Sequence, residues 1–375
     1  MRISAKRTNR IMGFICILLL MLPLAAFAAN KVVVIPLFDS SCTSGTCKPL
    51  KNIVTVAKAG GMFTDPVAAM ASITDASFDN PYLVVIGPGV YTVTSPVVMK
   101  SYVDIAGSGK NITTITGMIS GGTAADAAII KGATDSTLSS LHVSNAGGSG
   151  AYSIGLYIGV YQNYMNVNDV LLVVRGGVQN RAIHNEGGAL TIRGANISVS
   201  NSGGTTGIAI YNNGSAYMFD IDADVSGGTN SFGVFNVSAL LGSMNNVYIW
   251  AHNSTNNHGV YNGSSSNIKM NNVDIRAENG SKGYGVYNSD SSPKMTNVTA
   301  MTNCILSYGV YNDGSSPVIR GSRLDGLTDG LFTKGGTATV SQSTIKNGAA
   351  VDTGGINTCV ACDNGAGAAL NGICL

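Results

Sequence analysis

The chain of 375 residues carries 22 Lys and Arg against 20 Asp and Glu, and charged residues make up only 11% of it. Such sparse and balanced charge gives no basic cluster for nucleic acid. The scarcity of Glu, found only at Glu186 and Glu278, disfavours an all-helical fold. Hydrophobic residues reach 45% and alternate in short runs between 48 Gly, which favours a β-rich fold with many turns over disorder.

The N-terminal segment has the three parts of a signal peptide. Basic residues from Arg2 to Arg10 precede an apolar run, 11–22, which is too short to span a bilayer comfortably, and Ala26-Phe27-Ala28 offers a cleavage site. Four of the 22 basic residues and no acids lie in residues 1–28, so 18 basic and 20 acidic residues remain after cleavage, a net charge of −2. We expect a secreted, periplasmic or cell-surface protein with no transmembrane segment once the signal is removed. An uncleaved N-terminal anchor is the alternative.

Six cysteines remain beyond the signal, and an even number in an exported chain predicts disulfides. Cys42 and Cys47 form the most plausible local pair, and the other pairings stay open. The Cys359-x-x-Cys362 motif could instead be redox-active, or could bind zinc together with Cys374 and Cys304. Asp363 stands where a c-type haem site needs His, which excludes haem attachment.

The first elements predict the entry to a β structure. Thr64-Asp65-Pro66 places a capping residue before Pro at the first helical position, so we expect a short helix over 66–76 that covers an apolar end. Residues 82–86, 87–89 and 90–93 follow as strand, turn and strand. Further short strands are expected within 103–109 and 112–117.

A repeat of about 25 residues occupies the centre of the chain. Its first phrase is Gly-Val-aromatic-Asn, beginning at Gly233, Gly259, Gly285 and Gly309, with weaker copies before and after. A second phrase, beginning at Met244, Met270 and Met295, keeps nearly the same step. The first phrase supplies an aromatic column: Tyr157, His184, Tyr211, Phe235, Tyr261, Tyr287, Tyr311 and Phe332. It also supplies an Asn column: Asn185, Asn212, Asn236, Asn262, Asn288 and Asn312.

Short strands joined by Asn and Gly turns at this period fit one coil of a parallel β-helix. Leucine-rich and helical repeats need other residues, and WD-type blades are longer. We therefore predict an all-β fold, a right-handed parallel β-helix of roughly eleven coils. The expected boundaries are 29–80 for an N-terminal segment with the capping helix, 81–350 for the β-helix and 351–375 for a Cys-containing C-terminal cap. The Val of each phrase should point inward, the aromatics should stack, and the Asn amides should form a ladder in a left-handed turn.

Residues 54–117 resemble the entry segment of the pectin-esterase and pectate-lyase superfamily of β-helices. The resemblance lies in the strand and helix of 54–70, in the Gly87-Pro88-Gly89-Val90-Tyr91 corner, and in Ile105-Ala106-Gly107-Ser108-Gly109 with Thr114-Ile115-Thr116-Gly117. It implies the same fold. The later repeats are similar to the degenerate β-helix repeats of secreted bacterial proteins.

The catalytic segments of this superfamily are absent. Pectinesterases share Asp-Phe-Ile-Phe-Gly, Gln-Asp-Thr-Leu and Gly-Arg-x-Trp segments, polygalacturonases share Asn-Thr-Asp, Gly-His-Gly and Arg-Ile-Lys, and pectate lyases share Trp-x-Asp-His. None of these occurs here, and the single Trp, Trp250, has no Arg at the pectinesterase position. The resemblance therefore transfers no catalytic residue, and the fold alone does not imply an activity.

Strand alternation aligns outward positions across coils and predicts a ligand-binding face. One column, four residues after Met218 and after the start of each second phrase, contains Asp222, Tyr248, Asp274, Thr299 and Arg323. The next contains Asp224, Trp250, Arg276, Met301 and Asp325. Aromatic rings flanked by Asp and Arg suit a sugar, and we expect binding through Tyr248, Trp250, Asp222, Asp224, Asp274, Arg276, Arg323 and Asp325. An ordinary half-exposed sheet, with Arg276 paired to Asp274 or Asp224, is the alternative.

Two further hypotheses concern the same carboxylates. Asp222 and Asp274, two coils and about 9.6 Å apart, are candidate catalytic acids at the outer edge of the gap found in inverting glycosidases. Asp220, Asp222 and Asp224 alternate along one strand and are candidate Ca²⁺ ligands, so calcium is the one cofactor considered. The other histidines, His142, His252 and His258, show no partner at a meaningful spacing.

The sequence thus predicts an exported, non-catalytic β-helix that binds extracellular or cell-surface polysaccharide. A divergent pectin-type lyase, esterase or glycosidase is one alternative, and a structural envelope component that needs no ligand is the other.

Overall fold

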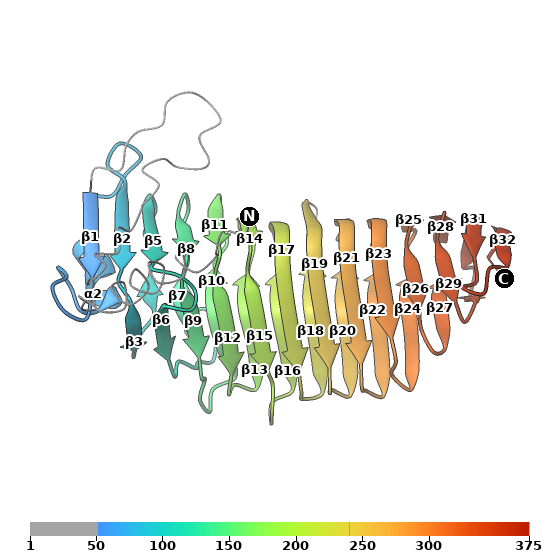
Figure 1. The fold of residues 1–375 in the computed structure, drawn as a ribbon, viewed down its shortest axis with the longest axis horizontal. Helices are drawn as coiled ribbons and strands as arrows, with labels where there is room; N and C mark the ends of the chain where they lie inside the picture. The colour runs from blue at the N-terminus through green and yellow to red at the C-terminus, as the bar shows by residue number, and fades with distance from the viewer. Residues whose placement is uncertain (1–51, 240, 375) are drawn as a thin grey trace, which may run out of the picture. The chain divides into compact units, whose positions relative to one another are not determined.

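The computed structural model describes residues 52–239 and 241–374. The expected signal peptide and the Cys42 and Cys47 pair lie outside these residues. The described chain is all-β apart from one helix, α2 (Pro66–Ser72). Every strand pairing is parallel except the last, between β31 and β32. The strands stack coil on coil in chain order (Figure 1), which confirms the predicted parallel β-helix.

The strands form two sheets, and every coil contributes to both except the incomplete first and last coils. The smaller sheet has 11 strands, one per complete coil, in agreement with the expected number of coils: β4 (Val97–Val98), β7 (Ala128–Lys131), β10 (Tyr152–Ile158), β13 (Gln179–Asn185), β16 (Thr206–Asn212), β18 (Asn230–Val237), β20 (Asn256–Gly263), β22 (Lys282–Ser289), β24 (Leu306–Asp313), β27 (Asp329–Lys334) and β30 (Ala349–Asp352).

The larger sheet has 21 strands. They are β1 (Asn52–Val56), β2 (Tyr82–Ile86), β3 (Gly89–Val93), β5 (Val103–Gly107), β6 (Thr113–Gly117), β8 (Thr137–Ser139), β9 (His142–Asn145), β11 (Met165–Asn168), β12 (Leu171–Arg175), β14 (Ala189–Arg193), β15 (Asn196–Ser200), β17 (Ser215–Ser226), β19 (Gly242–His252), β21 (Lys269–Glu278), β23 (Lys294–Thr302), β25 (Val318–Arg320), β26 (Arg323–Asp325), β28 (Thr337–Ser341), β29 (Thr344–Lys346), β31 (Ile356–Asp363) and β32 (Ala369–Ile373).

A left-handed residue bends each coil of the larger sheet into two flats. In β17, β19, β21 and β23 this corner is occupied by Asp220, Asn246, Asn272 and Asn297, whose φ angles lie between 52° and 56°. Their side chains form an exposed ladder in which each Asn amide donates to the corner residue of the preceding coil. We call the strand segment before the corner the first flat and the segment after it the second flat.

Inward side chains from both flats and from the smaller sheet fill a continuous core. Val234, Val260, Val286 and Val310, one from each strong first phrase, are fully buried, as predicted. The Met of each second phrase is buried as well. Because inward and outward positions alternate on each flat, the residues on either side of these core positions must face solvent.

On the outer face of the smaller sheet, the predicted aromatic column is confirmed. It forms a stack that runs from Tyr157 to Phe332, with the ring centroids of neighbours 4.5 to 5.7 Å apart. A second stack, of Phe232, His258, Tyr284 and Tyr308, lies beside it and was not predicted. Neighbouring rings cover each other's faces, so these columns offer a sugar mainly ring edges.

The Asn ladder is confirmed, but its place in the backbone differs from the prediction. Asn185 through Asn312 are buried, and each side-chain amide donates to the next residue of the column at 2.9 to 3.1 Å. None of the six has a positive φ. The left-handed corner belongs instead to the exposed ladder of Asn246, Asn272 and Asn297. One ladder satisfies amides inside the coil, and the other stabilises a bend.

The two ends depart from the expected boundaries. Asp65 caps α2 and accepts from the backbone of Val67 and Ala68, as predicted, but the helix ends at Ser72 rather than 76 because Ile73 is extended and buried. Parallel pairing begins with β1, before residue 81, and continues through β31, beyond residue 350. At the C-terminus, Cys359 bonds to Cys374, which rules out the redox motif with Cys362, while Cys304 and Cys362 are free and buried.

Candidate functional site

The strand register brings the predicted outward columns together on the second flat. Asp222, Tyr248 and Asp274 are successive neighbours across coils, as are Asp224, Trp250 and Arg276. Thr299 and Met301 occupy the next coil, followed by Arg323 and Asp325. A third column, which the sequence analysis missed, adds Ser226, His252 and Glu278. We call the outward residues of these three columns, from Asp222 to Glu278, the tryptophan face.

Trp250 lies at the centre of this face. Its indole stacks on the imidazole of His252, with centroids 3.9 Å apart and planes 19° from parallel, so His252 is only 9% exposed. The indole N–H donates to Glu278 at 3.0 Å across one coil. Trp250 is thus held in one orientation on the sheet, as a fixed aromatic surface requires.

Two open depressions flank Tyr248. One, of about 310 Å³, is lined by Asp222, Asp224, Tyr248 and Trp250 together with residues of the preceding coils. The other, of about 350 Å³, is lined by Tyr248, Asp274 and the exposed Asn ladder. Burial raises the pKa of the Tyr248 phenol, so this hydroxyl stays protonated and can donate a hydrogen bond into either depression. The face is therefore a wall with shallow hollows rather than a deep groove.

His252 does have a partner, contrary to the sequence analysis. Its Nε2 lies 2.9 Å from Asp224 on the preceding coil, and its Nδ1 lies 2.7 Å from the amide of Asn253. Asp224 precedes His252 by 28 residues, so only the stacking of coils reveals the pair. Both ring nitrogens are engaged and the ring lies under Trp250, so His252 supports the face rather than reaching a ligand.

Charged groups on the face are mostly acidic. Arg276 lies 4.0 Å from Asp274, two residues earlier in the same strand, and 5.9 Å from the centre of the Tyr248 ring. The sequence offered this pair as a feature of an ordinary half-exposed sheet, but it lies within one strand rather than across two. Asp222 is exposed, and no described residue bonds to its carboxylate. Arg323 and Asp325 pair with each other at 2.9 Å, three coils from Trp250, or about 14 Å at the strand spacing. They belong to the columns but lie outside the centre of the site.

The proposed calcium ligands do not converge. Asp220 occupies the left-handed corner and accepts from Asn246, whereas Asp222 and Asp224 lie on the second flat and Asp224 binds His252. Among residues 52–239 and 241–374, no group of three His, Cys, Asp or Glu side chains is placed to hold a metal ion. The same finding disfavours the zinc hypothesis for the cysteines.

The catalytic hypothesis for Asp222 and Asp274 meets a steric obstacle. The two residues are two coils apart, as predicted, but Tyr248 lies between them in the same column. Inverting glycosidases keep this gap open for the sugar and a water molecule. The half-buried Tyr248 side chain belongs to the column between them here, so Asp222 and Asp274 do not face each other across an open gap.

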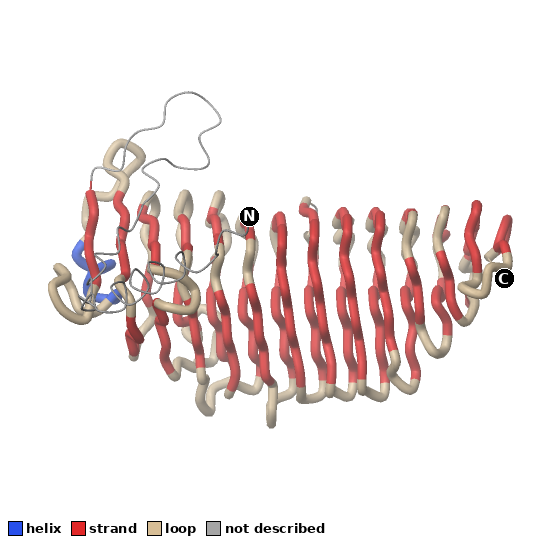
Figure 2. The backbone as a smooth tube through the Cα atoms, in the orientation of Figure 1, coloured by secondary structure: helices blue, strands red, loops and turns tan. Residues whose placement is uncertain are grey.

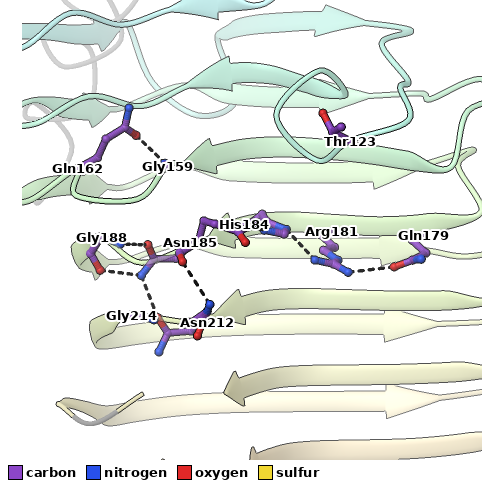
Figure 3. Close-up of polar contacts among 12 residues, drawn as sticks. Thr123, Gly159, Gln162, Gln179, Arg181, His184, Asn185, Gly188, Asn212 and Gly214 are labelled. Carbon is purple, nitrogen blue, oxygen red and sulfur yellow. Dashed lines mark hydrogen bonds and ion pairs between the residues drawn. The ribbon is translucent and has the colours of Figure 1, made fainter. Parts of the chain in front are cut away.

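A second polar cluster lies on the smaller sheet (Figure 3). His184 sits in the aromatic stack between Tyr157 and Tyr211, binds Glu186 through Nε2, and accepts from Arg181 through Nδ1 at 2.7 Å. Arg181 also donates to Gln179, and its guanidinium lies 4.4 Å from the centre of the Tyr211 ring. The cluster places the partly buried Arg181 guanidinium beside the stack, and His184 connects it to the carboxylate of Glu186.

The buried histidines should make stability depend on pH. Burial lowers the pKa of His184 to about 4 and that of His258 to about 3, both below the ~6.5 of an unfolded histidine. The unfolded chain therefore takes up protons first, and we expect stability to fall as pH decreases from about 6.5 to 4. The double variant His184→Tyr/His258→Tyr keeps the stacks aromatic. Between pH 7.5 and 4.5, its free energy of unfolding, measured with urea, should fall less than that of the wild type. Equal losses in both proteins would assign the effect to other groups.

Comparisons with known proteins add the fold context. No protein-family model matches the chain, and no curated protein matches it significantly. Among solved structures, the mannuronan C-5 epimerase AlgE4 A-module of Azotobacter vinelandii is similar, with 15% identity, a TM-score of 0.58, and coverage of 80% of this chain and 90% of that one.

Two pectin methylesterases also match, with lower scores. That of carrot has 11% identity, a TM-score of 0.41, and coverage of 84% of this chain and 90% of that one. PemA of Erwinia chrysanthemi has 15% identity, a TM-score of 0.36, and coverage of 78% and 79%. No helix among the described residues has the length and apolar character needed to cross a bilayer. The likeness to the AlgE4 A-module and the strand order together show that the chain has the parallel β-helix of the pectin-lyase-like fold.

Proposed function

We propose that this protein is an exported, non-catalytic β-helix that binds a polysaccharide on the tryptophan face. The observation that carries the proposal is the fixed indole of Trp250 beside two open depressions lined by carboxylates and Tyr248. An indole packs against the apolar face of a pyranose ring, and carboxylates accept hydrogen bonds from its hydroxyls. Export rests on the N-terminal pattern of basic residues, apolar run and small residues.

The charge of the tryptophan face narrows the choice of polysaccharide that it can bind. Asp222, Asp224, Asp274 and Glu278 surround Trp250, and Arg276 is the one fixed cation among them. Four carboxylates would repel a polymer that carries a carboxylate on each sugar. An uncharged or amino-sugar polymer therefore suits the face better than the pectin or mannuronan named for the structural neighbours.

Replacing Trp250 should test the proposal. We expect Trp250→Ala to weaken binding by about thirtyfold, since a central Trp typically contributes about 2 kcal/mol or more to an interface. Affinity electrophoresis through gels containing a β-glucan, mannan, chitosan, polygalacturonate or alginate would measure the loss. Phe78→Ala, which removes an exposed aromatic ring far from the face in sequence, serves as the control.

Asp222→Asn provides a second variant that leaves every described contact intact, and it should weaken retention by a hydroxylated polymer severalfold. The proposal fails if the wild type is retarded by no polymer, or if both Trp250→Ala and Asp222→Asn bind as the wild type does. Turnover of a polymer, lost in Asp222→Ala or Asp274→Ala, would favour the enzymatic alternative instead.

A further inference from the structure

The first flat carries positive charge, whereas the tryptophan face on the second flat is mostly acidic. Lys269 and Lys294 are direct neighbours across one coil, and Arg320 follows on the next coil in the adjacent outward column. All three are exposed, because the core residues Met270, Met295 and Ile319 beside them point inward. Arg193 lies in the same column as Arg320, further toward the N-terminus, with its guanidinium 4.1 Å from the centre of the Phe219 ring. We call these four residues the cationic face.

No acid shares these two columns between the coils of β8 and β31. From Thr137 to Thr358 and from Ser139 to Val360, the outward residues are uncharged apart from the four cations. Carboxylates occur beside these columns at the corner, at Asp169 and Asp220, and in the turn before β23, at Asp290. Like charges directly opposite each other are destabilising in a sheet, so the neighbouring lysines cost stability that an anionic partner would recover.

Three of the four cations on this face also have no carboxylate partner among the described residues. Lys110, Lys131, Lys334, Lys346 and Arg323 each lie within 4 Å of a carboxylate. The side chains of Lys269, Lys294 and Arg320, in contrast, contact no carboxylate of the described chain. Their full charge therefore faces solvent.

Exposed apolar side chains lie where the chain enters this flat. Tyr161 and Tyr164 are 83% and 71% exposed, and Tyr164 directly precedes β11; Leu241, 63% exposed, directly precedes β19. Val160, also exposed, belongs to the same loop as the tyrosines. The cationic face is thus bordered along its entry edge by side chains suited to the boundary between lipid headgroups and acyl chains.

The tyrosine loop is held in place despite an unfavourable backbone. Tyr161 and Tyr164 have φ angles of 65° and 59°, which bulky residues rarely adopt. Gln162 fixes the loop by accepting from the backbone of Gly159 at 2.7 Å, as Figure 3 shows, and Thr134 bonds the backbone of Tyr161 and Asn163. Figure 2 shows the loops that connect successive strands along the edges of the stack. A locally strained conformation that presents two exposed tyrosines is typical of a recognition element.

We infer that the cationic face, together with its apolar edge, docks the protein on an anionic phospholipid surface. Each Lys or Arg near such a surface contributes a favourable interaction, while Tyr161, Tyr164 and Leu241 insert among the headgroups. A bilayer fits the edge better than a soluble polyanion does, because an acidic polymer offers no apolar region that the exposed Leu241 and Val160 could contact. The inference does not depend on the tryptophan face, which lies on the other flat and stays open for its own ligand.

Vesicle co-sedimentation of the purified protein tests this inference. We expect binding to vesicles of phosphatidylcholine with phosphatidylglycerol, weak binding to phosphatidylcholine alone, and a steep loss with added salt. Lys269→Gln/Lys294→Gln should lower the partition coefficient about thirtyfold. The matched control Arg175→Gln/Lys282→Gln removes two exposed cations outside the cationic face and should change it little. Wild type and variants share one N-terminal segment, so its own affinity for lipid cancels.

Tyr161→Asn/Tyr164→Asn probes the edge with residues that tolerate the left-handed backbone, and it should reduce binding severalfold while keeping the salt dependence. Equal losses in the two charge pairs would overturn the inference, as would equal binding to neutral vesicles. It also fails if dextran sulfate or single-stranded DNA binds through Lys269 and Lys294 while anionic vesicles do not.

Discussion

Asn262→Ala should destabilise the protein by about 2–5 kcal/mol, one of the two largest effects we expect. Asn262 is fully buried in the inner ladder, where it accepts from Asn236 and donates to Asn288, both at 2.9 Å. Its removal leaves one buried donor and one buried acceptor unpaired, and each unsatisfied group costs about 1–3 kcal/mol. Equilibrium urea unfolding followed by circular dichroism would measure the loss.

Asn271→Ala is the matched control for this variant. Asn271 is exposed on the first flat, so its truncation should change stability by no more than about 0.5 kcal/mol. If Asn262→Ala and Asn271→Ala unfold at the same urea concentration, the inner amides do not hold neighbouring coils together.

Gly259→Ala should cost about 3 kcal/mol, because the added methyl group enters a filled core. A Cβ at this position would lie 1.9 Å from Cγ2 of Ile275 and 2.7 Å from the carbonyl oxygen of Gly285 on the next coil. The Ile275 side chain can shift, but the carbonyl oxygen belongs to the backbone ladder and can move only if that ladder is distorted. The same contact explains why Gly recurs in the first phrase, where Gly233, Gly285 and Gly309 meet equivalent obstacles.

Gly122→Ala gives the comparison, since a Cβ there meets no atom within 4 Å and the backbone φ is not positive. We expect its stability to equal that of the wild type within about 0.5 kcal/mol, or to rise slightly through the smaller entropy of the unfolded chain. Thermal unfolding of both variants would measure the difference. A Gly259→Ala protein as stable as the Gly122→Ala protein would contradict the inward placement of the repeated glycine.

The two flats of the larger sheet assign different tasks to one scaffold. On the second flat, Trp250 is fixed over His252 and surrounded by carboxylates; on the first, Lys269 and Lys294 face solvent without partners. A stack of similar coils allows this division of tasks, because the same kind of residue at one position of every repeat forms a continuous column along the sheet. Such a protein would dock on an anionic surface through one flat and hold a glycan on the other.

Sequence periodicity alone determined the columns. The step between repeats equals one coil, so residues at the same place in successive repeats must become neighbours at the ~4.8 Å strand spacing. For this reason Asp222, Tyr248 and Asp274 could be aligned from the sequence, as could the aromatic stack from Tyr157 to Phe332, and the structure confirms both.

Tertiary structure decided what the period leaves open, namely how each coil bends and which columns meet across it. Asn262 and Asn272 look alike in sequence, but one lies buried in a strand and the other forms an exposed left-handed corner, because only the closure of the coil fixes where the backbone must turn. The contact of His252 with Asp224 depends on that same closure and on the side-chain rotamers of the second flat. The number of residues between two positions does not predict such contacts. The stacking of Trp250 on His252, which Asp224 holds in place, could therefore be found only in the three-dimensional structure.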